Sequence, residues 1–85
     1  MTVPKKNNQP YSLNIGINVR KWRELKGIKQ ELLASKLGIT KAALSNIENN
    51  KVDISLHRIE DIANCLEIDA MRLFVNPLDL ILPPQ

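Results

Sequence analysis

Residues 30–47 read QELLASKLGITKAALSNI and have the spacing of two short helices joined by a tight turn. Leu33 belongs to the apolar stripe of the first helix, and the small Ala34 beside it lets the two helix backbones approach. Gly38 follows that helix, in the place where a helix commonly ends in the left-handed conformation that glycine adopts without strain. Thr40 then stands at the N-cap of the second helix, because its hydroxyl can accept from an unpaired backbone N–H. The stretch therefore predicts two helices locked at a wide angle around a turn.

The sequence on either side of this pair predicts three more short helices. The first places Ile15, Val19 and Trp22 on one face, at spacings of four and three residues. The fourth begins after Ser55 and the fifth after Asp69, residue types that favour the N-cap. The dipeptide Asn-Pro then ends the fifth, because proline disfavours helix in the residue before it. No segment alternates as a strand would, so the predicted fold class is all-α, a compact five-helix bundle.

The chain divides into three segments. Residues 1–12 hold two prolines, two lysines and three amide side chains without periodicity, and predict a flexible arm. Residues 13–76 hold the helices and are expected to form one domain. Residues 77–85 include four large aliphatic side chains, which are too many for a solvated tail. We expect this last segment either to fold back onto the fourth and fifth helices or to cover a partner.

Charge is distributed unevenly along the 85 residues, whose net charge is +3. Residues 1–51 carry ten basic and three acidic side chains, whereas residues 52–85 carry two basic and six acidic ones. A basic half joined to an acidic half predicts that one face of the molecule meets a polyanion and the other does not.

Several classes of protein are excluded by composition. Cys65 is the only cysteine, which rules out an internal disulfide and a cysteine-based zinc site. His57 lies eight residues away from it, and we expect neither a shared metal nor a shared catalytic role. The sequence shows no recognisable catalytic set or phosphate-binding glycine loop, so we expect no enzyme activity, no metal and no cofactor. Without a membrane span or a secretory signal, a reduced, cytoplasmic setting is expected.

Residues 15–51, IGINVRKWRELKGIKQELLASKLGITKAALSNIENNK, resemble the phage-repressor/Xre-type (Cro-like) helix-turn-helix family of transcriptional regulators. The resemblance extends over residues 13–74 and includes the downstream segment SLHRIEDIANCL. It implies a compact bundle of five helices whose third helix enters the DNA major groove. It also implies a homodimer that binds a near-palindromic operator in double-stranded DNA.

The resemblance implies base contacts on the third helix, over residues 40–49. Lys41 can donate to guanine O6 and N7 or to a phosphate, and Ala42 is small enough to touch a thymine methyl group. Asn46 can pair with adenine N6 and N7, while Ser45 discriminates less between bases. The alternative is that any of these four side chains is only an exposed helix residue.

The resemblance also implies phosphate contacts, which position the protein without reading sequence. Gln30 matches the family residue that holds a backbone phosphate, and Thr40 is an N-cap whose hydroxyl can serve both purposes. Residues after the third helix match positions where family members offer backbone N–H groups, and two further basic side chains add charge. The phosphate candidates are Gln30, Thr40, Asn49, Asn50, Lys51, Arg20 and Lys29.

Arg23 and Glu48 match family positions that form a partly buried ion pair between the first and third helices. The sequence also departs from the family pattern at two positions. Lys29 stands where serine or threonine usually caps the second helix, so that cap is weak. Asn50 replaces a common glycine, and asparagine is the next most tolerant residue of the left-handed region.

The dimer surface is predicted on the fourth and fifth helices and the aliphatic segment, at Phe74, Leu80, Ile81 and Leu82. Two other functions use the same fold. The chain can be an antitoxin-type protein whose C-terminal segment binds a toxin and whose helix pair regulates its own operon. It can also be an adaptor that does not bind DNA.

Overall fold

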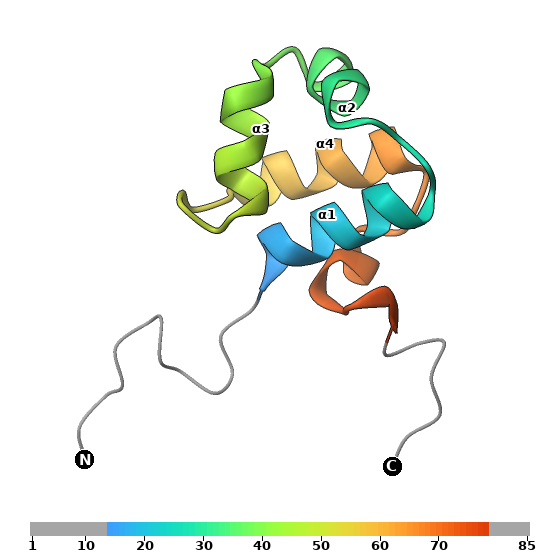
Figure 1. The fold of residues 1–85 in the computed structure, drawn as a ribbon. Coiled ribbons are helices and arrows are strands. Elements are labelled where there is room, and N and C mark those ends of the chain that lie inside the picture. The colour runs from blue at the N-terminus through green and yellow to red at the C-terminus, as the bar shows by residue number, and fades with distance from the viewer. Residues whose placement is uncertain (1–13, 79–85) are drawn as a thin grey trace, which may run out of the picture.

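The computed structural model describes residues 14–78, which form four α-helices and one 3₁₀-helix (Figure 1). The elements are α1 (Ile15–Leu25), α2 (Gln30–Leu37), α3 (Lys41–Glu48), α4 (Leu56–Leu66) and η2 (Ala70–Phe74). No strand occurs within these described residues, so the all-α prediction is confirmed. The predicted fifth helix differs from expectation, because η2 is a 3₁₀-helix.

The short length of η2 explains its conformation. Its N-cap Asp69 accepts from the N–H of Met71 at 3.0 Å, and the carbonyl of Asp69 accepts from the N–H of Arg72 at 2.9 Å. These are tight three-residue turns, and Val75 is already extended ahead of the Asn-Pro dipeptide. The segment thus ends before a second α-helical turn is complete.

α4 and α1 cross the middle of the domain, with α2 and α3 on one side of them and η2 on the other (Figure 1). Six side chains are almost completely buried between these layers: Leu33, Leu44, Ile62, Leu66, Leu73 and Val19. Every element contributes to this set, which is why the domain has one core.

α1 fixes η2 through side-chain hydrogen bonds. Asn18, buried on α1, donates from Nδ2 to the carbonyl of Leu73 at 2.9 Å. Trp22 donates from Nε1 to the carbonyls of Arg72 at 2.8 Å and Val75 at 3.1 Å. The carbonyls of Arg72, Leu73 and Val75 therefore have partners although the segment is not a regular helix.

Local caps and turns set the ends of the helices. Thr40 Oγ1 accepts from the N–H of Ala43 at 3.0 Å, while α2 has no side-chain cap at Lys29. Gly38 ends α2 in the left-handed region at φ 71°. Asn50 adopts φ 57°, as expected for a glycine replacement, but Glu67 has the same φ at the end of α4, which the sequence does not indicate.

Part of the sequence analysis falls outside the described residues. The predicted arm at residues 1–12 lies there, as do Leu80, Ile81 and Leu82 of the predicted dimer surface. Phe74 is described and is half-buried against the core of its own chain. None of the described helices is long and apolar enough to cross a membrane.

Candidate nucleic-acid interface

The outward face of α3 is formed by the side chains that the sequence predicts to read bases. Lys41, Ala42 and Asn46 are exposed and Ser45 is half-buried. The opposite face of α3 is buried in the core through Leu44, Ile47 and Glu48. Three of the four predicted base-reading side chains are therefore exposed, while Ser45 is half-buried and its Oγ accepts from Asn49 Nδ2 at 3.3 Å.

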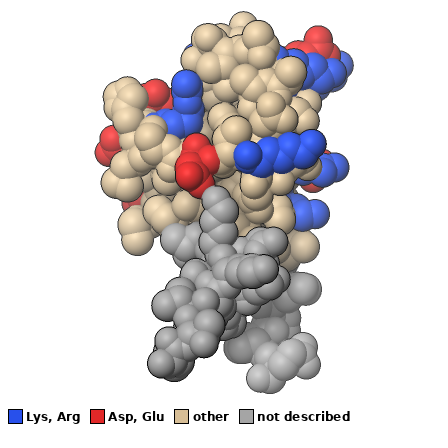
Figure 2. Space-filling view, turned by 90° about the vertical axis from the view of Figure 1, so that its left-hand side faces the viewer, with Lys and Arg blue, Asp and Glu red and all other residues tan. Residues whose placement is uncertain are grey.

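Figure 2 views the molecule from the side that carries α3. Lys and Arg side chains reach this face at several separate places, with Asp and Glu side chains between them. The surface is thus mixed in charge, and individual ion pairs decide which basic groups are available to a polyanion.

Lys41 lies near an acid of the preceding helix. Its Nζ lies 3.9 Å from Oε1 of Glu31, and the two side chains are 61% and 75% exposed. The pair joins the first turn of α3 to the first turn of α2 across the tight turn. Sequence reasoning missed Glu31 because the contact depends on how the two helices cross.

Glu48 links three helices through one carboxylate. Arg23 on α1 donates from Nε to Oε2 at 2.7 Å and from Nη2 to Oε1 at 3.0 Å. Gln30 on α2 donates from Nε2 to Oε1 at 3.0 Å. The Glu48 side chain is 2% exposed and that of Arg23 is 11% exposed. The ion pair implied by the family resemblance is therefore present and is almost completely buried from solvent.

The position of Gln30 adds to what the sequence predicts for it. Gln30 is the first residue of α2, a helix whose N-terminus has no side-chain cap. Its side chain is hydrogen-bonded to Glu48. The side-chain oxygen of Gln30 and its remaining N–H are not used in that bond. The amide is thus held in place by a buried group and keeps hydrogen-bonding capacity for a phosphate.

The residues after α3 have their backbone N–H groups occupied. The N–H groups of Asn49, Asn50 and Lys51 donate to carbonyls of α3 at 3.0, 3.1 and 2.9 Å. Contacts from this loop to a phosphate must therefore come from side chains. The exposed Lys51 supplies a charge, whereas Asn49 Nδ2 already donates to the carbonyl of Ser45 at 2.9 Å.

Asn50 has a structural task that the sequence does not reveal. Its Oδ1 accepts from the N–H of Gly16 at 3.1 Å and so caps the first turn of α1. A Cβ atom on Gly16 would lie only 2.0 Å from the carbonyl oxygen of Ile47. Glycine is required there because α1 and the end of α3 touch backbone to backbone.

The other phosphate candidates lie around this surface. Arg20 is paired with Glu24 on α1 at 3.2 Å, and both side chains are about half exposed. Lys29 is exposed at the N-cap of α2, and Thr40 is exposed with its hydroxyl hydrogen still free to donate.

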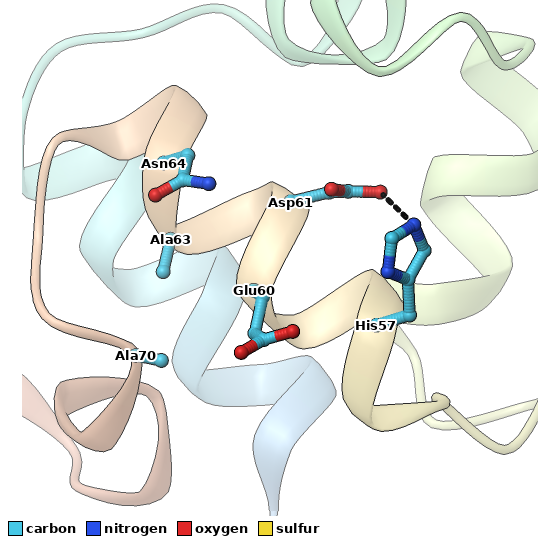
Figure 3. A pocket seen from close by; sticks show the side chains of 6 residues that line it. All are labelled: His57, Glu60, Asp61, Ala63, Asn64 and Ala70. Carbon is cyan, nitrogen blue, oxygen red and sulfur yellow. Dashed lines mark ion pairs between the residues drawn. The ribbon is translucent and has the colours of Figure 1, made fainter.

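A separate hollow of about 340 Å³ lies along α4, where Ala70 of the following segment completes its lining (Figure 3). His57 and Asp61 face each other there, with 3.5 Å between Nε2 and Oδ2. Among the described residues no group of three or more metal-binding side chains forms. Cys65 is half-buried against the core, as expected for a small core-edge residue.

The comparisons with known proteins define the class. Residues 19–73 match the helix-turn-helix family model, which covers more than half of the chain, so this chain belongs to that family. It is a DNA-binding transcriptional regulator of a non-enzymatic family, which confirms the resemblance found in the sequence.

Three solved structures are similar to this chain. The restriction-modification controller protein C.AhdI of Aeromonas hydrophila is 30% identical, with a TM-score of 0.67 over 72% of this chain and 92% of its own. The hypothetical transcription factor NHTF of Neisseria is 27% identical, with a TM-score of 0.71 over 95% of this chain and 91% of its own. The clp gene regulator ClgR of C. glutamicum shares the fold, with a TM-score of 0.75 at 16% identity over 91% of this chain and 100% of its own. No curated protein matches the chain.

Proposed function

We propose that this chain binds a near-palindromic operator in double-stranded DNA as a homodimer, with one α3 in each of two successive major grooves. The observation that carries the proposal is the outward face of α3, where Lys41, Ala42 and Asn46 are exposed while the opposite face is buried. An α-helix fits the major groove, and these side chains match the donors and small apolar groups that read base edges there. Two copies would sit about 34–36 Å apart.

Phosphate contacts in this proposal flank α3. Gln30, fixed by Glu48, and Thr40, at the start of α3, meet the backbone on one side, and Lys51 meets it on the other. Arg20 and Lys29 add charge to the same complex. Any contribution of Asn49 and Asn50 in this proposal comes from the N–H bonds of their side-chain amides that are left over, because their backbone N–H groups, Asn49 Nδ2 and Asn50 Oδ1 already take part in hydrogen bonds.

Dimerisation in this proposal uses the end of the domain that is opposite the helix pair. Met71 is 69% exposed and Leu78 is 46% exposed there, next to the half-buried Phe74. These residues adjoin the aliphatic segment that contains Leu80, Ile81 and Leu82. Apolar side chains exposed in one region favour contact with a second copy.

The test is selection of bound duplexes from a random pool, followed by titration of the selected duplex over a range of salt concentrations. A dimer that neutralises about four to six phosphates should give a log–log slope of roughly −4 to −5. Absence of salt-sensitive binding to any duplex would refute DNA binding and leave the adaptor function.

Asn46→Ala tests the base contact in the same assay. We expect about 10- to 100-fold weaker binding to the selected duplex and little change on duplexes that differ at the base pair it reads. Asn64→Ala is the matched control, because Asn64 is an exposed asparagine on α4. An equal loss on every duplex would show that Asn46 holds a phosphate or the fold instead of a base.

A further inference from the structure

The three acids within residues 1–51 have different surroundings. Glu48 is buried against Arg23, and Glu24 is paired with Arg20 along α1. Glu31 is 75% exposed and lies 3.9 Å from Lys41, a residue of the proposed base-reading face. It is therefore an acid that stands at the DNA-binding surface itself.

Any group of DNA that contacts Lys41 also approaches Glu31. A charge-assisted hydrogen bond from Lys41 Nζ to an oxygen or nitrogen of DNA is about 2.8 Å long. The carboxylate of Glu31 then lies within roughly 7 Å of that DNA atom, which is inside the screening length at physiological salt. A phosphate at this point is repelled by Glu31 while it competes with Glu31 for the same ammonium group.

We propose that Glu31 is a specificity-determining residue that keeps Lys41 from binding phosphates of unrelated DNA. The inference rests on the proposed function, and it assigns to Glu31 the control of one contact. On unrelated sequences Glu31 competes with phosphates for Lys41 and repels them, so Lys41 contributes less to phosphate binding. On the operator, a base edge at the right position accepts from Lys41 and displaces the exposed pair.

The exposure of the pair makes this exchange feasible. Ion pairs between solvent-exposed side chains contribute little, since water screens them. A well-placed guanine offers Lys41 two acceptors in a groove from which water is partly excluded, and it can replace Glu31. A phosphate offers no such geometric advantage and brings its own repulsion with Glu31.

Glu31→Gln tests whether Glu31 keeps Lys41 from phosphates, because it removes the charge and keeps the length and shape of the side chain. Lys41 then becomes free to contact a phosphate on any sequence. For unrelated DNA we expect the log–log salt slope of the dimer to steepen by up to about 1.8, because each of the two subunits gains one phosphate contact worth about 0.9. We expect affinity for unrelated DNA to rise about 5- to 10-fold and operator affinity by about 2-fold at most, so that the specificity ratio falls.

Glu60→Gln is the matched control, because Glu60 is an exposed acid on α4 and its loss changes the net charge equally. It should leave both slopes unchanged. In a Lys41→Gln background, Glu31→Gln should no longer steepen the slope for unrelated DNA. Glu31 also lies in the first turn of α2, where an acid favours the helix dipole, but that role affects stability and leaves the salt slope unaltered.

The outcomes distinguish this inference from the proposed function. Salt-sensitive binding by the wild type, together with equal behaviour of Glu31→Gln and Glu60→Gln, would overturn the role of Glu31 alone. Persistence of the steeper slope in the Lys41→Gln background would also overturn it, since Glu31 would then act without Lys41. A wild-type protein that binds no duplex would remove both proposals.

Discussion

Glu48 fixes α3 against α1 and α2. Its carboxylate accepts from Arg23 twice and from Gln30 once, so that α1, α2 and α3 meet at one buried charge. The guanidinium of Arg23 has a further acceptor in the carbonyl of Ile28 at 2.8 Å. Because all these groups are desolvated, the arrangement is far more sensitive to loss of one partner than an exposed pair.

Glu48→Ala should lower the free energy of unfolding by about 3–5 kcal/mol, because it leaves the charge of Arg23 buried and uncompensated. Urea denaturation followed by the fluorescence of Trp22, the only tryptophan, measures the loss. Glu24→Ala is the control, since its pair with Arg20 is exposed and should contribute about 0.3–0.5 kcal/mol.

Glu48→Gln provides a second measurement if the alanine variant does not fold. The amide keeps an acceptor for Arg23 but loses the charge, so its stability should lie between wild type and Glu48→Ala. Equal urea midpoints for Glu48→Ala and the wild type would show that this ion pair does not stabilise the fold.

α1 and α3 approach so closely at Gly16 that the position requires glycine, although glycine has a low helix propensity. Gly16 stands in the first turn of α1, where alanine is normally the better residue by about 1 kcal/mol. In the folded domain the added methyl group would overlap the carbonyl oxygen of Ile47 and the side-chain oxygen of Asn50. The contact between elements thus reverses the preference of the element alone.

Gly16→Ala should therefore lower the free energy of unfolding by about 1–3 kcal/mol, the usual cost of overpacking, instead of raising it. Thermal or urea unfolding measures whether the free energy of unfolding falls or rises. Ser35→Ala on the exposed side of α2 is the control, since it changes helix propensity without a contact between helices. A stabilising effect of Gly16→Ala would mean that α1 and α3 are further apart than described.

Over the domain as a whole, the proposed functions divide between its two ends. The helix pair α2 and α3 lies at one end, and η2, which contains the exposed Met71, lies at the other (Figure 1). The net charge of +3 is the sum of a positive charge on residues 1–51 and a smaller negative charge on residues 52–85. In the proposed function, one end meets DNA while the other meets a second copy of the chain.

Deletion of residues 78–85 should convert the dimer to a monomer, because it removes the aliphatic side chains proposed to bury the contact. Sedimentation equilibrium measures the mass, and urea unfolding of the truncated protein shows whether the core is retained. Operator affinity should fall strongly while binding to a single half-site is kept. A truncated protein that still sediments as a dimer would place the interface elsewhere.

The local arrangement followed from the sequence because it depends on neighbouring residues. The bounds of α2, its left-handed end at Gly38 and the Thr40 cap are set within a few residues of the chain. The outward position of Lys41 and Asn46 follows from helical periodicity once Leu44 and Ile47 are buried. The Arg23–Glu48 pair was accessible only through family resemblance, since 25 residues separate its members.

Tertiary structure decided the contacts that cross between helices. The bond of Gln30 to Glu48, the pairing of Glu31 with Lys41 and the approach of Gly16 to Ile47 depend on crossing angles that no local pattern encodes. The 3₁₀ form of η2 is likewise accompanied by bonds from α1, at the side chains of Asn18 and Trp22. The sequence by itself thus determined the helix-turn-helix pair and the outward face of α3. Packing determined which side chains around α3 are free to act, because their availability depends on neighbours that are distant in the chain.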